Sequence, residues 1–88
     1  MKNAFNNLYE LVPVYDARQS FYRKAFVHID GNGNKQLYSY ETLVAEVKNG
    51  VPKLHGKYSQ TTTRHQKEFL KQEGFTDTEI KTMLKNAA

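Results

Sequence analysis

Residues 21–55 read FYRKAFVHIDGNGNKQLYSYETLVAEVKNGVPKLH. Apolar and polar side chains alternate from Phe21 to Ile29, which indicates a β-strand with one buried face. The segment Asp30–Asn34 is rich in glycine and asparagine, which tolerate the positive φ angles of a hairpin loop. Leu37–Tyr40 and Leu43–Lys48 are rich in β-branched and aromatic residues and read as the next strands. We therefore predict a β-meander that carries most of the hydrophobic core.

The meander continues through a tight turn. Asn49-Gly50 is a strong signal for a two-residue hairpin turn. The strand that follows contains Pro52, which has no N–H to donate, so we expect this strand at an edge of the sheet. An uncovered edge at Val51–His55 could pair with a second copy of the chain and make a homodimer.

The segment before the meander is open to two interpretations. Phe5, Leu8 and Val12 fit one stripe of a helix that ends at Pro13, whereas Leu8–Val12 also alternates as a strand. We favour the strand and leave the helix over residues 3–12 as the alternative.

The pattern changes at Ser59. We expect a helix that begins within Ser59–Thr63, where several hydroxyl groups could cap it, and that runs to about Glu73. Gly74 and Phe75 then suit the C′ and C″ positions of a Schellman motif. Thr76–Glu79 has the pattern of a capping box, which predicts the start of a second helix. The chain is therefore predicted to be one α+β domain over residues 1–88: an antiparallel meander of four or five strands within residues 8–56, then two short helices within residues 59–87.

Composition narrows the classes of function. The chain has 88 residues, no cysteine, a formal charge of +4 and a pI near 9.4. Without cysteine, a disulfide framework, a thiolate metal site and thiol catalysis are excluded. No apolar run approaches the length of a membrane span, so we expect a soluble protein in the cytoplasm. The positive charge favours an acidic partner, either nucleic acid or an acidic protein surface.

One loop is similar to a calcium site. Asp30–Glu41 places oxygen ligands at EF-hand loop positions one, three, five and twelve. Position six, where the turn requires glycine, is Lys35, and no second EF-hand is present. A single calcium-binding EF-hand is therefore the less favoured alternative, and a plain hairpin loop is the preferred interpretation.

The C-terminal half contains two further candidates. The corner Leu70–Met83 resembles a helix-turn-helix, although Leu70 and Glu73 depart from its pattern and Asp77 would face the phosphates. The cluster Thr61–His65 at a helix start could hold a phosphate, but redundant capping is the favoured alternative. A small basic nucleic-acid-binding regulator that uses these helices is thus the second hypothesis.

Basic residues interleave with tyrosines along the whole chain, a mixture typical of surfaces that bind nucleic acid or acidic proteins. The histidines lack metal-ligand spacing, the carboxylates form no evident pair and no serine has a nucleophile-elbow context. We therefore expect a protein that is not an enzyme, with no catalytic residue, no metal and no cofactor. The residues we expect to contact a partner are Arg18, Arg23, Tyr38, Tyr40, Arg64 and Lys67.

Three segments carry a family resemblance. Residues 7–25, 37–45 and 58–72 together resemble small proteins carried by phages and other mobile elements of Gram-positive bacteria. The shared features are a Ser-Tyr-x-Thr-x-Val-Ala strand and a Thr-Thr-x-Arg-His helix start, within roughly residues 7–73. Glu41 stands where that group often has asparagine.

The resemblance implies the β-meander and provides no active site. The group is mostly of unassigned function, and small proteins from the same gene neighbourhoods include inhibitors of type II CRISPR nucleases. The function we expect is therefore that of a non-enzymatic mobile-element protein that binds and inhibits a host defence nuclease such as Cas9. Because the chain is basic, we expect contact with an acidic groove or with the guide RNA rather than mimicry of DNA.

Overall fold

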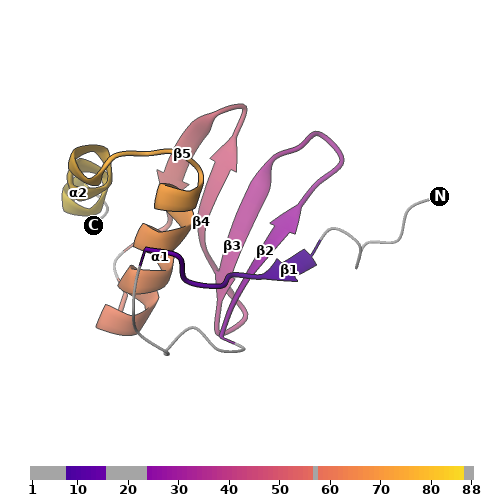
Figure 1. Cartoon of the computed structure of the whole chain (residues 1–88), viewed down its shortest axis with the longest axis horizontal. Helices are drawn as coiled ribbons and strands as arrows, with labels where there is room; N and C mark the ends of the chain where they lie inside the picture. The colour runs from indigo at the N-terminus through magenta and orange to yellow at the C-terminus, as the bar shows by residue number, and fades with distance from the viewer. Residues whose placement is uncertain (1–7, 16–23, 57, 87–88) are drawn as a thin grey trace.

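A computed structural model of the chain describes residues 8–15, 24–56 and 58–86. The strands form one antiparallel sheet in the order β1-β2-β3-β4-β5, and two helices follow them in the chain (Figure 1). The predicted α+β fold, a meander followed by two C-terminal helices, is confirmed. The elements are β1 (Leu8–Glu10), β2 (Ala25–Ile29), β3 (Lys35–Ser39), β4 (Thr42–Lys48), β5 (Val51–Leu54), α1 (Gln60–Gln72) and α2 (Asp77–Asn86).

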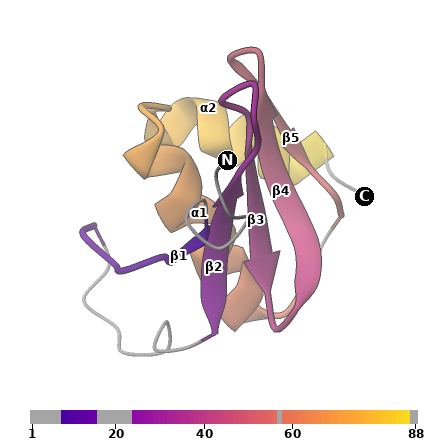
Figure 2. The same ribbon diagram turned by 90° about the vertical axis from the view of Figure 1, so that its right-hand side faces the viewer.

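The core lies between the sheet and the helices. Figure 2 shows α1 and α2 on the same side of the sheet. Alternate residues of the central strands point to that side, because side chains along a strand alternate between its two faces. The buried apolar residues are Leu11, Ala25, Val27, Leu37, Val44, Ala45, Phe69, Leu70 and Ile80. Within the described ranges, neither helix lies on the opposite face, which we call the open face.

The corner between the two helices follows the sequence prediction closely. Gly74 has φ = 97°, its N–H donates to the Lys71 carbonyl at 3.0 Å, and the Phe75 N–H donates to the Leu70 carbonyl at 3.0 Å. These two bonds define a Schellman motif. Thr76 and Glu79 exchange side-chain to backbone bonds of 2.8 and 3.2 Å, which complete the capping box.

The turn between β3 and β4 differs from the prediction. We predicted that a strand would include Tyr40, but Ser39 pairs with Thr42, so the chain reverses at Tyr40 and Glu41. Both turn residues have positive φ angles, 51° and 70°. Strand propensity therefore does not decide the conformation of Tyr40, because the pairing of its neighbours forces a two-residue turn there.

Other boundaries shift by a few residues. β1 ends at Glu10 rather than Val12, although the Leu11 N–H still donates to the Ala25 carbonyl and the Leu11 side chain is fully buried. β3 begins at Lys35, two residues earlier than predicted. The strand predicted over Phe21–Ile29 is β2, which spans Ala25–Ile29, and its predicted first residues, 21–23, lie outside the described part of the chain. Pro52 lies in β5, an edge strand, as predicted.

Candidate partner-binding surfaces

The open face of the sheet carries an apolar depression. Phe26 on β2 and Tyr38 on β3 are cross-strand partners, and both point away from the helices. Leu8, 48% exposed, and Tyr40, 53% exposed, extend this apolar surface. The depression has a volume of about 540 Å³. We call it the open-face patch, and its lining residues are Leu8, Lys24, Phe26, Tyr38, Tyr40 and Glu41.

The charges around the open-face patch are balanced. Lys24 and Glu41 lie on its rim, one of each sign. Further along the same face, His55 and Glu46 are 3.1 Å apart. An aromatic centre with a polar rim of mixed charge is the usual anatomy of a protein–protein interface.

The tight turn at one end of the patch is strained. Tyr40 and Glu41 occupy the left-handed region of φ, which costs an L-residue roughly 1–2 kcal/mol. A two-residue hairpin turn requires positive φ at both positions, so the pairing of Ser39 with Thr42 maintains this strain. The Tyr40 ring also lies 6.0 Å from the His65 ring, centroid to centroid, so α1 contacts the turn through His65.

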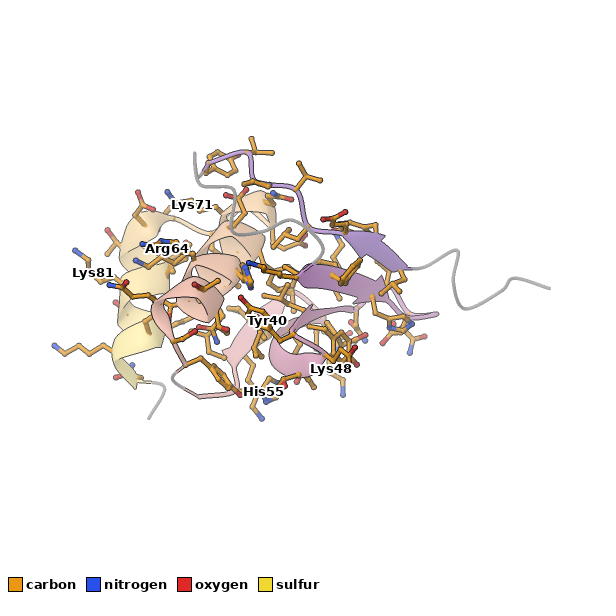
Figure 3. The ribbon with its side chains drawn as sticks, turned by 90° about the horizontal axis from the view of Figure 1, so that it is seen from below. Tyr40, Lys48, His55, Arg64, Lys71 and Lys81 are labelled. Atoms are coloured by element: carbon orange, nitrogen blue, oxygen red, sulfur yellow. The ribbon has the colours of Figure 1, made fainter. Side chains whose placement is uncertain are left out.

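The second surface lies between the helices. Arg64, Lys67 and Lys71 on α1 face Lys81 on α2 across a hollow of about 370 Å³. We call it the α1–α2 basic groove. Figure 3 shows Arg64, Lys71 and Lys81 over the two helices, with Lys48 well away from them. Its lining residues are Tyr15, Arg64, Lys67, Glu68, Lys71, Asp77, Ile80, Lys81 and Leu84.

Two carboxylates in the groove have different roles. Glu68 is 2% exposed and accepts hydrogen bonds from the backbone N–H groups of Val14, at 2.8 Å, and Tyr15, at 3.1 Å. These bonds attach residues 14 and 15, which follow β1, to helix α1. Asp77 is 79% exposed at its side chain, and its Oδ1 lies 2.9 Å from Lys71 Nζ. The hydrogen bond and positive charge of Lys71, with smaller contributions from Lys67 and Lys81, lower the pKa of Asp77.

The helix start holds a buried polar cluster. Ser39 Oγ lies 2.8 Å from His65 Nδ1 and 3.0 Å from Thr62 Oγ1. Ser39 is 2% exposed and His65 is fully buried, so no substrate reaches this serine–histidine pair. Ser59 caps α1, with its hydroxyl accepting from the Thr62 N–H at 3.3 Å. The cap is thus Ser59 alone among the described residues, and Thr62 and His65 of the Thr61–His65 cluster join the helix to the sheet instead of capping it or holding a phosphate.

In the loop that is similar to a calcium site, the Asp30 carboxylate is hydrogen-bonded to the backbone of the loop. Within Asp30–Glu41, residues 30–34 join β2 to β3 and residues 35–39 form β3, whereas an EF-hand loop joins two helices. Asp30 Oδ1 accepts hydrogen bonds from the Asn32 N–H at 2.9 Å and the Asn34 N–H at 3.0 Å. These bonds, the one from Asn32 above all, lower the pKa of Asp30. The EF-hand alternative is thus wrong for this loop. Among the described residues, no group of three or more acidic or histidine side chains could hold a metal ion.

The six residues proposed from the sequence do not form one site. Tyr38 and Tyr40 line the open-face patch, whereas Arg64 and Lys67 line the α1–α2 basic groove. Arg18 and Arg23 lie outside the described residues.

The prediction missed most of the other lining residues. Phe26 and Leu8 belong to the patch because of strand pairing, which no local pattern reveals. Lys71 follows Arg64 and Lys67 at helical spacing, so this periodicity could have identified it. Lys81 joins the groove only through the packing of α2 on α1.

Together these features define a small α+β protein with two exposed surfaces of different chemistry, one aromatic and one basic. A family model matches residues 9–85, and the chain belongs to this family, which is described as a family of unknown function (DUF8033). Comparison with curated proteins and with solved structures found no match. Neither described helix has the length and apolar character needed to cross a membrane.

Proposed function

We propose that this protein is a non-enzymatic binding protein that docks on a host protein through the open-face patch. The single observation that carries the proposal is the half-buried Phe26–Tyr38 pair on the open face, extended by the exposed side chains of Leu8 and Tyr40. Aromatic residues at the centre of a patch supply most of the binding energy of a typical interface. The turn between β3 and β4 presents the Tyr40 side chain, 53% exposed, at one end of the patch.

The partner we propose is a host defence nuclease, specifically a type II CRISPR Cas9, in the cytoplasm of the bacterial host. The support for this target is the resemblance to mobile-element proteins. In this proposal the protein inhibits by covering a surface of the nuclease and carries out no chemistry of its own. The balanced charge of the open-face patch suits a protein surface better than it suits DNA.

The test is a cleavage assay with a purified Cas9–guide RNA complex from a Gram-positive host and a plasmid target. Adding the protein should abolish cleavage at about one copy per complex, and Tyr38→Ala should weaken inhibition about tenfold or more. The matched control is Tyr58→Ala, which removes a tyrosine that is 38% exposed and lies outside the patch. Full cleavage in the presence of excess wild-type protein would refute the Cas9 target.

A second candidate function is supported by the α1–α2 basic groove, whose four cations outnumber its two carboxylates. In this alternative the protein is a small basic regulator that binds nucleic acid with its helices. The two candidates differ in salt dependence, because phosphate binding weakens steeply as salt rises and a packed protein interface does not.

A further inference from the structure

The cations of the α1–α2 basic groove form a line. Arg64, Lys67 and Lys71 follow one another at intervals of three and four residues, so they share one face of α1. At 1.5 Å per residue they extend over about 10 Å, the axial length of about three phosphate-to-phosphate steps of one DNA strand. Lys81 adds a cation from the opposite wall of the groove.

The groove of the free protein already contains an anion. The Asp77 carboxylate lies 2.9 Å from Lys71 Nζ and is otherwise open to water. Lys71, Lys67 and Lys81 all stabilise its charged form. Three cations therefore act on a position that is accessible to an external oxyanion.

The floor of the groove holds a second carboxylate, that of Glu68, whose charge also acts on Lys71. Glu68 is buried, and its oxygens accept hydrogen bonds from the backbone of Val14 and Tyr15. Lys71 Nζ also lies 5.7 Å from the centroid of the Tyr15 ring, a cation–π contact that holds the side chain over the groove.

The walls favour a phosphodiester chain over an acidic peptide. A peptide strand needs backbone partners, but the walls are helices, whose backbone groups are bonded internally. An amphipathic helix needs a broad apolar floor, whereas Ile80 at the base of the groove is only 2% exposed. A phosphodiester strand carries one charge at every repeat of its backbone, so a line of cations on a helix is enough to hold it.

We propose that the α1–α2 basic groove binds the phosphate backbone of a nucleic acid, and that Asp77 occupies the place on Lys71 that a phosphate takes in the complex. This inference rests on the second candidate function above and adds the site and an internal competitor to it. Binding therefore requires the ion pair between Asp77 and Lys71 to break. Removal of the Asp77 charge should strengthen binding, whereas removal of any groove cation should weaken it.

The experiment measures fluorescence anisotropy of labelled oligonucleotides between about 50 and about 200 mM salt. Single-stranded DNA, RNA of the same sequence and duplex DNA are compared, since all three present a phosphodiester backbone, at about twice the charge per length in the duplex. Asp77→Asn should bind several-fold more tightly than the wild type. Lys67→Ala and Lys81→Ala should each bind more weakly and lower the salt slope by about 1.

The matched control is Lys53→Ala, which removes an exposed lysine of β5 that does not line the groove. It should lower affinity less than Lys67→Ala does. If none of the oligonucleotides binds even at low salt, the second candidate function itself fails.

If they bind but Asp77→Asn leaves affinity unchanged, or Lys53→Ala weakens binding as much as Lys67→Ala, only this inference is overturned. Displacement of the oligonucleotide by poly-glutamate at equal charge concentration would also overturn it, in favour of an acidic protein partner.

Discussion

Ser39 Oγ, at the end of β3, lies 2.8 Å from Nδ1 of His65, on the first turns of α1. Both side chains are buried, and Thr62 shares the same serine hydroxyl. This contact joins the sheet to the helix at the level of the strained turn, because Tyr40 follows Ser39 directly and its ring lies beside that of His65. The polar cluster therefore positions the Tyr40 end of the open-face patch.

Ser39→Ala should destabilise the protein by about 1–3 kcal/mol, because a buried histidine nitrogen and a threonine hydroxyl lose their shared partner. Urea unfolding followed by circular dichroism measures the change. Thr42→Ala, at an exposed position of β4, is the control and should cost clearly less. Equal effects of the two substitutions would show that the cluster adds no stability.

Glu41→Gly should stabilise the protein by about 0.5–1 kcal/mol, because glycine adopts the φ of 70° at this position without steric cost. The turn at Asn49-Gly50 provides the opposite comparison, since Gly50 has φ = 79° and already suits its position. Gly50→Ala should therefore destabilise. The prediction fails if the midpoint of urea unfolding moves in the same direction for both variants.

Glu68→Gln should loosen the segment that follows β1. The new amide offers one acceptor where the carboxylate offered two, and its NH₂ group faces the N–H donors of Val14 and Tyr15. We expect a loss of about 1–3 kcal/mol and faster amide hydrogen exchange at those two residues. The Leu11 amide, which donates to the Ala25 carbonyl at 2.8 Å, should be affected less and serves as the internal reference. Unchanged exchange at Val14 and Tyr15 would contradict the role of Glu68.

Acid should weaken the β2–β3 loop through Asp30. Its pKa is lowered in the folded protein, chiefly by the Asn32 N–H, so its contribution to stability is present above the unfolded pKa of about 3.9. That contribution is lost as pH falls through the folded pKa. Asp30→Asn keeps a side-chain oxygen acceptor and cannot titrate. Its stability should therefore fall less steeply than that of the wild type between about pH 5 and pH 2.5. If the free energy of unfolding falls equally steeply with pH for the two proteins, the prediction is wrong.

Local patterns were sufficient for the elements whose signals lie close together in the chain. The corner at Gly74 and Phe75 depends on hydrogen bonds between residues at most five positions apart, so it could be predicted in detail. The Asn49-Gly50 turn and the edge position of Pro52 have the same local origin. Tyr40 could not be placed correctly, because its conformation follows from the pairing of Ser39 with Thr42 and from the burial of Ser39 against α1.

By itself the amino-acid sequence determined the meander, the two helices with their caps and the excess of positive charge, because alternation, turn residues and composition are local or additive properties. Only the tertiary structure decided how the side chains are grouped. Strand pairing placed Phe26 beside Tyr38. The packing of α2 on α1 placed Lys81 across from Lys67 and brought Asp77 to Lys71. Residues that lie far apart in the chain meet only when the hydrophobic core fixes the arrangement of the elements, so the two surfaces follow from packing and not from any local motif.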